Sequence, residues 1–382
     1  MSPLTGYWNA DGKAGIRNYV AVIPLSVFSN SAALSIANMI DGTIPLVHPH
    51  GRAEIGINKI RLEENLIGQV LNPNVQSALL VGYEGKTTER YLRKIRGLTK
   101  KPVDFVNVLE KGTITAVSEG AKLALELSSV ASEVKREPIS FADLTVGIKC
   151  GSTDATSGIA SNPAVGKAVD HVVNEGGRAI FSETTEIMGA EHILVKRAKD
   201  DAVAKKILQA VRNNEKLAID NGVDLLGVNP VPDNIEGGIS TIEEKSLGAI
   251  MKTGSTQIKD VLQLGDRPQE PGLFFLDYPA AAQEVLTALT SSGCQIILFS
   301  TGAGNPSGTP VAPVLKVTGN ARTVARIGEH IDVDVSGIIT DGISYDDAGI
   351  RILSKMEKII NGGRTKAELL RHREFSPVAV GL

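Results

Sequence analysis

Short apolar runs alternate along the chain with longer segments whose apolar residues recur at helical spacing. In the first third the runs are YVAVIP at residues 19–24, ALLVG at 78–82 and VDFVNV at 103–108. After the first run, residues 26–40 begin with a serine-rich turn and continue with a helical period. The alternation predicts an α/β fold made of repeated strand and helix units.

Four later runs have strand character, and each ends in Gly, Ser, Thr or Asp: LTVGIKCG, RAIFSET, QIILFSTG and VSGIITDG. Helix-compatible stretches, such as residues 190–210 and 242–250, separate them. This pattern predicts a Rossmann-like, mainly parallel sheet. Because ligands bind outside the carboxyl ends of parallel strands, we expect the polar strand ends to meet in one crevice.

The length of 382 residues favours two domains over one core. The charged, proline-containing segment EVKREPIS at 133–140 breaks the alternation and resembles a linker. We therefore predict an N-terminal α/β domain at 1–135 and a C-terminal Rossmann-like catalytic domain at 140–382. The charged tail after Arg364 is expected to be peripheral.

Composition narrows the class of protein. The chain is 42% hydrophobic and 22% charged, which is typical of a soluble enzyme, and its formal charge of -3 argues against a nucleic-acid partner. Two cysteines lack the spacing of a zinc site or a disulfide framework, which favours a reducing cytoplasm. No apolar run reaches the roughly 18 residues of a membrane span, and no leader is recognisable, so we expect a cytoplasmic protein without a membrane partner.

The segment KCGSTD, from Lys149 to Asp154, ends a predicted strand and enters a polar turn. Exposed amides at such a turn favour an anion, and Lys149 or Asp154 is suited to a substrate carboxylate or hydroxyl. Ser152 and Thr153 lie in the same turn. The alternative is an ordinary capped turn between a strand and a helix.

The segment SETTE at 182–186 directly follows the run RAIF and is the sharpest signal for chemistry. Its carboxylates, Glu183 and Glu186, with Glu191 and His192 nearby, are suited to act as a base or as metal ligands in the abstraction of a proton α to a carboxylate. The alternative is that acids decorate a helix N-terminus. If Glu183 is catalytic, Glu183→Gln should lower turnover with little change in melting temperature.

Two glycine-containing loops are further candidates. GGISTIEEKS at 237–246 contains Gly238, Glu243 and Lys245; a capping box explains its acids, whereas the lysine is suited to an anion above the Gly-Gly loop. STGAGN at 300–305, with Thr301 and Gly302, is typical either of a backbone nest for an oxyanion or of a plain connecting loop.

Two signals are weaker. His48 and His50 flank a proline and are either metal ligands or part of a solvated loop. Arg17 and Asn18 precede the first strand, where an arginine either clamps a carboxylate or forms a surface pair.

Taken together, these blocks resemble the altronate and galactarate dehydratase family, which includes the large subunit of sulfolactate sulfo-lyase. The resemblance rests on GYWNADGKAGIRNYVAV, VGIKCGSTDATSGIASNPAVGKAVD, FSETTEIMGAEHIL, GGISTIEEKSLGAIMKTG, LFFLDYP and LFSTGAGNPSG, in this order. It implies a lyase that removes water from a small sugar acid, such as an aldonate or aldarate, to give a 2-keto-3-deoxy acid. Removal of sulfite from sulfolactate is the alternative reaction.

The resemblance also implies a site, a cofactor and an assembly. Fe²⁺ or Mn²⁺ is the expected metal, and a homo-oligomer is the expected assembly. The residues assigned to catalysis are Lys149, Asp154, Glu183, Glu186, Glu243 and Lys245; to substrate binding, Arg17, Asn18, Ser152, Thr153, Gly238, Thr301 and Gly302; and to metal binding, Glu191, His192, His48 and His50.

The chain departs from the family pattern at positions where the dehydratases have cysteines. Asn30, Arg52, Gly85 and Val335 stand there, and Ala303 replaces the arginine of a TTGRG-like loop. Soft thiolate ligands are not replaced by arginine or glycine. A sugar-acid-binding member without catalysis is therefore a further alternative. The chain also begins near GYWNADG, where sugar-acid dehydratases have an additional small domain, so we expect a separate small subunit.

Overall fold

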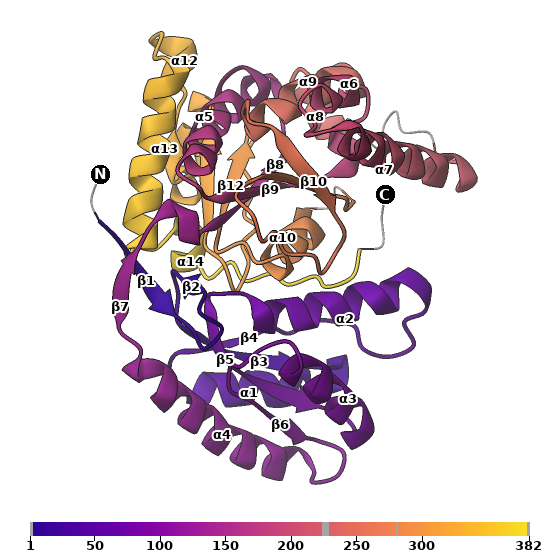
Figure 1. The fold of residues 1–382 in the computed structure, drawn as a ribbon, viewed down its shortest axis with the longest axis vertical. Helices are drawn as coiled ribbons and strands as arrows, with labels where there is room; N and C mark the ends of the chain where they lie inside the picture. Colours follow the sequence, from indigo (N-terminus) through magenta and orange to yellow (C-terminus); the bar gives the residue numbers. More distant parts are fainter. Residues whose placement is uncertain (1–2, 224–228, 280–281, 380–382) are drawn as a thin grey trace.

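The computed structural model describes residues 3–223, 229–279 and 282–379. Its lower part in Figure 1 holds four described strands in the order β4-β3-β5-β6, all parallel. One face packs against α1 and α4, and the other packs against α2 and α3. The bounds are β3 Tyr19–Pro24, β4 Thr43–Pro45, β5 Val75–Gly82, β6 Val103–Asn107, α1 Asn30–Met39, α2 Gly56–Leu71, α3 Gly85–Arg96 and α4 Thr113–Glu133.

The upper part holds seven described strands in the order β10-β11-β9-β8-β12-β13-β14, again all parallel. The helices α5, α7 and α13 cover one face, and α10 covers the other. The bounds are β8 Thr145–Gly151, β9 Arg178–Phe181, β10 Ile258–Leu262, β11 Gly272–Leu276, β12 Ile296–Thr301, β13 Val314–Thr318, β14 Val333–Asp334, α5 Asn162–Asn174, α7 Asp201–Asp220, α10 Ala282–Ser291 and α13 Tyr345–Ile360. The predicted α/β class with a mainly parallel second sheet is confirmed.

Among the described residues, six further short α-helices belong to the upper part. Several follow the carboxyl ends of strands, where they shape the loops of that edge. They are α6 Glu191–Val195, α8 Pro232–Glu236, α9 Ile242–Ile250, α11 Ala321–Ile327, α12 Gly337–Thr340 and α14 Lys366–Leu369. No helix among the described residues is both long enough and apolar enough to cross a membrane.

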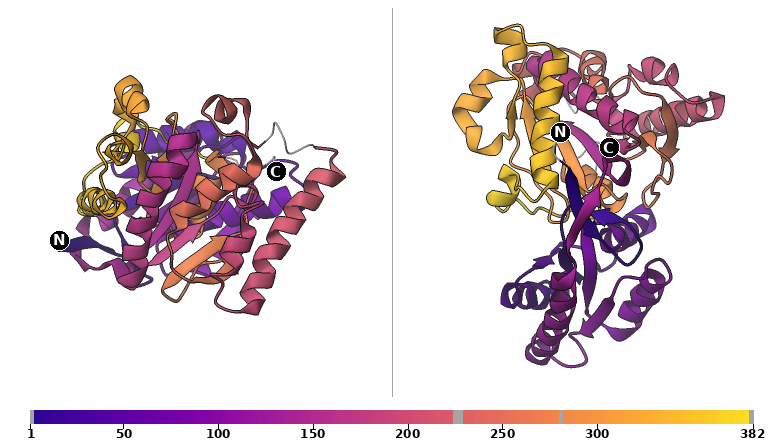
Figure 2. Two further views of the ribbon diagram at one scale, coloured as in Figure 1. Left: turned by 90° about the horizontal axis from the view of Figure 1, so that it is seen from above. Right: turned by 60° about the vertical axis from the view of Figure 1, so that its left-hand side comes forward.

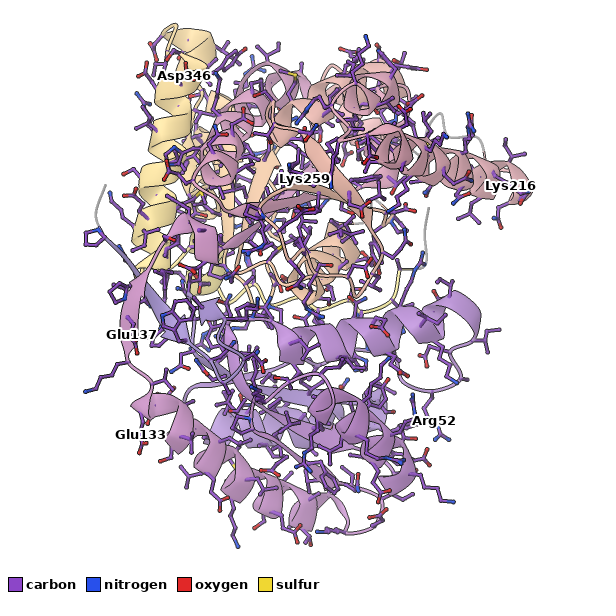
Figure 3. All side chains as sticks on the ribbon, viewed as in Figure 1. Arg52, Glu133, Glu137, Lys216, Lys259 and Asp346 are labelled. Carbon is purple, nitrogen blue, oxygen red and sulfur yellow. The ribbon has the colours of Figure 1, made fainter. Side chains whose placement is uncertain are left out.

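The segment expected to be a linker forms a strand. β7 (Arg136–Ile139) pairs antiparallel with β1 (Leu4–Trp8), which also pairs with β2 (Ala14–Gly15). The Arg136 guanidinium lies 4.8 Å from the centre of the Tyr7 ring. Figure 3 shows Glu133 and Glu137 along this connection, and the right-hand view of Figure 2 shows it between the two large sheets.

The prediction of a peripheral tail is wrong. Phe375 and Val378 are buried in the same core as Ile23 and Leu66 of the first sheet and its helix α2. The Asn65 side-chain amide donates to the carbonyl of Pro377 at 2.8 Å. The charges of the tail masked its apolar residues in FSPVA at 375–379, which return to cover α2.

Candidate active site

A buried ionic cluster lies at the carboxyl ends of the adjacent strands β8 and β9. Lys149 belongs to β8, Glu183 follows β9, and Lys252 lies in a short 3-10 helix, Met251–Thr253, after α9. Both lysines form ion pairs with Glu183, Lys149 with Oε1 and Lys252 with Oε2, the latter at 2.8 Å. All three side chains are only 1% exposed. Glu183 has φ 77°, a left-handed conformation that is uncommon outside glycine and is held here by these partners.

The cluster carries one net positive charge. Burial alone raises the pKa of Glu183, but the two ammonium groups outweigh it and hold that pKa at about 2. Burial lowers the pKa of Lys252, and the attraction of Cys150 and Glu183 more than reverses this, so the pKa of Lys252 is raised. Burial raises the pKa of the Cys150 thiol, whose Sγ lies 3.0 Å from the Lys252 ammonium. Two ammonium groups therefore face one carboxylate.

A second ion pair joins Glu186 and Lys245 at 3.0 Å. Glu186 ends a 3-10 helix, Thr184–Glu186, and Lys245 lies on α9. The Lys245 ammonium also donates to Asn229 Oδ1 at 2.5 Å and to Asn234 Oδ1 at 3.0 Å, which uses its three protons. Among the described residues, Glu186 Oε2 is buried with no hydrogen-bond partner. The pair thus leaves one carboxylate oxygen as a free acceptor.

A cleft of about 980 Å³ lies at the carboxyl ends of β8, β12, β13 and β14, the same sheet edge, although the ion-paired side chains are not among the residues that line it. Asn234, which accepts from Lys245, donates from its side-chain amide to the carbonyl of Thr153 at 2.9 Å, and Thr153 lies between Ser152 and Asp154 of the cleft wall. Polar side chains dominate its wall, among them Ser152, Asp154, Glu236, Asn320, Arg322 and Arg326.

Asp154 is fixed within that wall. Its Oδ1 accepts from the Ser157 amide at 3.1 Å, and its Oδ2 accepts from the Asn320 side chain at 2.7 Å. A Cβ at Gly302 would lie 2.2 Å from Asp154 Cγ, so only glycine allows this approach. Gly302 also donates to the carbonyl of Ser152 at 3.1 Å.

Two arginines on successive turns of α11 line the cleft. Arg326 donates to the carbonyl of Ala303 at 2.6 Å, and Arg322 is exposed. Ala303 is the position where the resemblance led us to expect an arginine. A guanidinium therefore reaches this loop from the helix and offers a cationic donor for a carboxylate, in a wall that also carries Asp154, Asp233 and Glu236.

The structure brings most of the predicted site to one edge of the seven-stranded sheet. Glu243 is exposed in the first turn of α9, and it is Glu244 that bonds to the backbone and side chain of Ser240. His192 is exposed on α6. The residues that meet at this edge are Lys149, Ser152, Thr153, Asp154, Glu183, Glu186, Lys245, Thr301 and Gly302, with Gly238 beside Ala155.

Four predicted site residues lie elsewhere. All five N–H groups of Arg17 are engaged, by Glu368 and by the carbonyls of Ile16, Ile359 and Gly363, so it clamps the chain instead of a substrate. Asn18 donates to the carbonyl of Ala131 at the end of α4. The other two, His48 and His50, follow β4 in the first sheet.

The residues expected to bind a metal do not form a ligand set. His48 is buried, its Nε2 bonds to the Pro24 carbonyl and its Nδ1 accepts from the His50 amide, while burial lowers its pKa to about 4. No group of three or more His, Cys, Asp or Glu side chains suited to a metal occurs in the part of the chain that the structure describes. The donors present therefore do not fit iron or manganese, and the metal stays a prediction.

Arg52 adds to this misfit. It stands where the resemblance expects a cysteine, and its guanidinium lies 5.7 Å from the Phe28 ring centre and 5.5 Å from that of Tyr83. A fixed cation on two aromatic faces repels a metal ion. Figure 3 shows Arg52 on the loop that precedes α2.

Sequence reasoning missed Lys252, Asn229, Asn234 and Arg326. Lys252 lies in the segment GAIMKTG, where one lysine among apolar and small residues is a signal for a buried cation. The two asparagines and Arg326 have no such signal, because their role depends on contacts with Lys245 and Ala303 that are distant in sequence.

Comparison with known proteins assigns the chain to a family. Residues 141–382 match the C-terminal domain of D-galactarate/altronate dehydratase, and residues 6–132 match the second domain of D-galactarate dehydratase/altronate hydrolase. The (2R)-sulfolactate sulfo-lyase subunit beta of Chromohalobacter salexigens is 40% identical, over 97% of this chain and 95% of that protein. Altronate dehydratase of Escherichia coli is 30% identical over 97% of this chain and 76% of that protein, and galactarate dehydratase (L-threo-forming) of the same species is 29% identical over 94% and 72%. The chain is a lyase that belongs to the D-galactarate/altronate dehydratase family.

Proposed function

We propose that this lyase removes water from a small sugar acid, an aldonate or aldarate, and forms a 2-keto-3-deoxy acid. The supporting observation is the convergence, at one sheet edge, of a cleft with two arginines, a carboxylate with a free oxygen and a buried cluster of net positive charge. Membership of a dehydratase family supports the same reaction.

The cleft suits an anionic, hydroxylated substrate. Arg322 and Arg326 offer cationic donors for a carboxylate, and Ser152 and Asn320 offer hydrogen bonds to hydroxyl groups. Asp154 accepts hydrogen bonds from the Thr156 hydroxyl, the Ser157 amide and hydroxyl and the Asn320 side chain, which fix its carboxylate in the cleft wall next to a substrate hydroxyl.

The free Oε2 of Glu186 is our choice for the base that takes the α-proton. Lys245 holds Oε1 and is itself held by two asparagines, so Lys245 orients the base and is not free to bind substrate. Once the α C–H bond breaks, its electron pair forms the new C=C bond and the β C–O bond breaks. The leaving hydroxide takes up the proton that Glu186 has removed and departs as water, and the enol takes a proton from solvent at its β-carbon as it becomes the keto acid.

The negative charge that develops on the substrate carboxylate needs a positive field. The Lys149–Glu183–Lys252 cluster supplies this positive field from the carboxyl ends of β8 and β9. Because the cluster is buried, its charge acts more strongly than it would in water. Because these side chains are only 1% exposed, we assign them a field and positioning role, and no metal step is included in this scheme.

Carbon–sulfur cleavage is a second candidate. The sulfo-lyase subunit beta matches 97% of this chain at 40% identity, against 30% for altronate dehydratase. Elimination of sulfite from sulfolactate follows the same course, with the C–S bond in place of the C–O bond. The two arginines of the cleft are equally suited to a sulfonate.

We also propose that a separate small polypeptide works with this chain, since one relative is named as a subunit. Co-purification of the natively expressed chain checks this. A chain that runs alone and reaches full turnover without a partner contradicts it.

A panel of substrates tests the reaction. Purified protein is incubated with altronate, galactarate and sulfolactate, and both 2-keto acid and sulfite are measured. Keto acid without sulfite from a sugar acid supports dehydration, and sulfite from sulfolactate supports the second candidate. Ligand-induced thermal stabilisation without any product points instead to a binding protein.

A further inference from the structure

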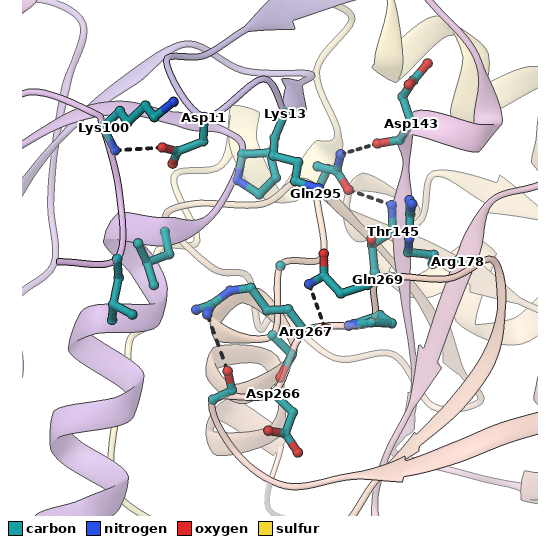
Figure 4. Close-up of a pocket in the computed structure, with 17 residues that line it drawn as sticks. Asp11, Lys13, Lys100, Asp143, Thr145, Arg178, Asp266, Arg267, Gln269 and Gln295 are labelled. Carbon is teal, nitrogen blue, oxygen red and sulfur yellow. Dashed lines mark hydrogen bonds between the residues drawn. The ribbon is translucent and has the colours of Figure 1, made fainter. Parts of the chain in front are cut away.

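A second pocket lies at the opposite edge of the seven-stranded sheet, away from the cleft. It has a volume of about 520 Å³, within the range of small-molecule sites. Thr145 and Arg178 begin β8 and β9, and Gln295 directly precedes β12, so the pocket faces the amino ends of the strands. Its other wall comes from the first part of the chain, through Asp11 and Lys13 (Figure 4).

The basic groups of this pocket outnumber its acids. Lys13, Lys100, Arg178 and Arg267 line it, and so do three aspartates. Both lysines are exposed, and no hydrogen bond or ion pair within the described ranges engages either ammonium group.

Each aspartate is already occupied. Asp11 accepts from the Lys100 amide at 2.7 Å, Asp143 from the Ser140 amide at 2.8 Å and Asp266 from the Gln263 amide at 2.8 Å. In each case a carboxylate oxygen accepts from a backbone amide, and the ammonium groups of Lys13 and Lys100 are left for another partner.

The pocket also contains donors that no described group accepts. Ser292 Oγ, Arg178 Nε and Arg267 Nε are buried without a hydrogen-bond partner in the described part of the chain. The terminal nitrogens of Arg267 are fixed by the carbonyls of Gly265 and Ser291, the second at 2.7 Å. Unsatisfied donors of this kind are uncommon in folded proteins, and an anion would satisfy them after small side-chain shifts.

We propose that this pocket binds a small organic polyanion carrying phosphate or carboxylate groups, and that the bound anion joins the two parts of the chain. Lys13 and Lys100 lie on the first part, and Arg178 and Arg267 lie on the second. An anion held by both sides stabilises their packing, so binding raises the melting temperature. The site is separate from the cleft and does not depend on the proposed reaction.

Calorimetry and thermal melting test the proposal, with pyrophosphate as the phosphate probe, citrate as the carboxylate probe and sucrose as a neutral control. We expect saturable binding and a raised melting temperature with at least one of the two anions, and the tighter one identifies the ligand chemistry. Lys13→Ala/Lys100→Ala should weaken that binding about tenfold, because two charge-assisted hydrogen bonds are lost.

Two control variants locate the bound anion. Lys122→Ala/Lys205→Ala removes two exposed lysines that do not line the pocket, and binding should be unchanged. Arg322→Ala/Arg326→Ala disrupts the cleft, and binding should persist. The proposal is overturned if neither anion binds saturably up to about 10 mM, if both lysine pairs weaken binding equally, or if the cleft variant abolishes it.

Discussion

Glu183→Gln tests whether the buried ionic cluster holds the seven-stranded sheet together. The substitution leaves two ammonium groups, each on a side chain 1% exposed, without a carboxylate. Breaking a buried ion pair costs about 3–5 kcal/mol, because the remaining charge is buried without compensation. From the sequence, little change in melting temperature was expected if Glu183 is a base or ligand; its burial between two lysines leads us to expect a loss of stability instead.

The pKa of Glu183 gives a second estimate of how much the ion pairs contribute to the free energy of unfolding. It falls from the ordinary value of 4.5 to about 2, which corresponds to about 3 kcal/mol of stability. The folded-state pKa is depressed, so this contribution is present above pH 4.5 and is lost as the pH falls from 4.5 toward 2. The raised pKa of Lys252 reflects the same interaction and is not added again.

Urea unfolding of the wild type and of Glu183→Gln, at pH 7 and at several pH values below 4.5, measures this directly. We expect the variant to be about 3 kcal/mol less stable at pH 7 and the difference to shrink as the pH falls. Glu175→Gln, at an exposed residue, is the control and should change stability by less than about 0.5 kcal/mol. A difference below about 1 kcal/mol at pH 7, or one that does not change with pH, refutes the reasoning.

Three further predictions concern the site. Glu186→Gln should lower kcat by about 100-fold or more, since it removes the proposed base, while exposed Glu243→Gln changes it little; equal effects on kcat would refute the assignment. Arg326→Ala should raise KM about tenfold with a smaller effect on kcat, because a substrate carboxylate loses one cationic donor; an unchanged KM in steady-state kinetics would place Arg326 outside substrate binding. Treatment with EDTA should leave turnover unchanged, and elemental analysis should find substoichiometric iron and manganese. A loss of turnover that Fe²⁺ or Mn²⁺ restores would contradict this and show that a metal is bound by donors other than those described.

Local sequence patterns were sufficient to predict the fold class. Apolar runs such as residues 19–24 and 78–82 form β3 and most of β5, because the burial of a strand and the turn that ends it depend on a short stretch of sequence. The pairing of β7 with β1 could not be predicted, since it joins residues about 130 positions apart. The burial of the tail was not predicted for a related reason. Its charges can be read in the tail sequence itself, whereas the apolar surface of α2 that it covers lies about 300 residues earlier.

The same distinction applies to the site. Acids and lysines after strands, such as Glu183 and Lys149, were found because polar groups at strand ends are unusual and visible in one stretch of sequence. The roles of these residues could not be predicted, because partners from other segments decide whether a carboxylate is free or neutralised. Glu183 is held by two lysines, whereas Glu186 keeps one free oxygen, although both belong to the same five-residue segment.

Arginines occupy or contact two of the positions where the resemblance predicts other residues. Arg52 brings a cation to the edge of the first sheet, and Arg326 brings one to the loop at Ala303. At the edge of the seven-stranded sheet, Arg326 and the Lys149–Glu183–Lys252 cluster supply positive charge from side chains. Such a site stabilises an enediolate only if its cations keep their charge, and the Glu183 carboxylate between the two lysines favours their charged forms. We therefore expect Lys252→Met to lose turnover while it partly retains the melting temperature. The methionine side chain fills a similar volume, but it is neutral and leaves the cluster without net charge.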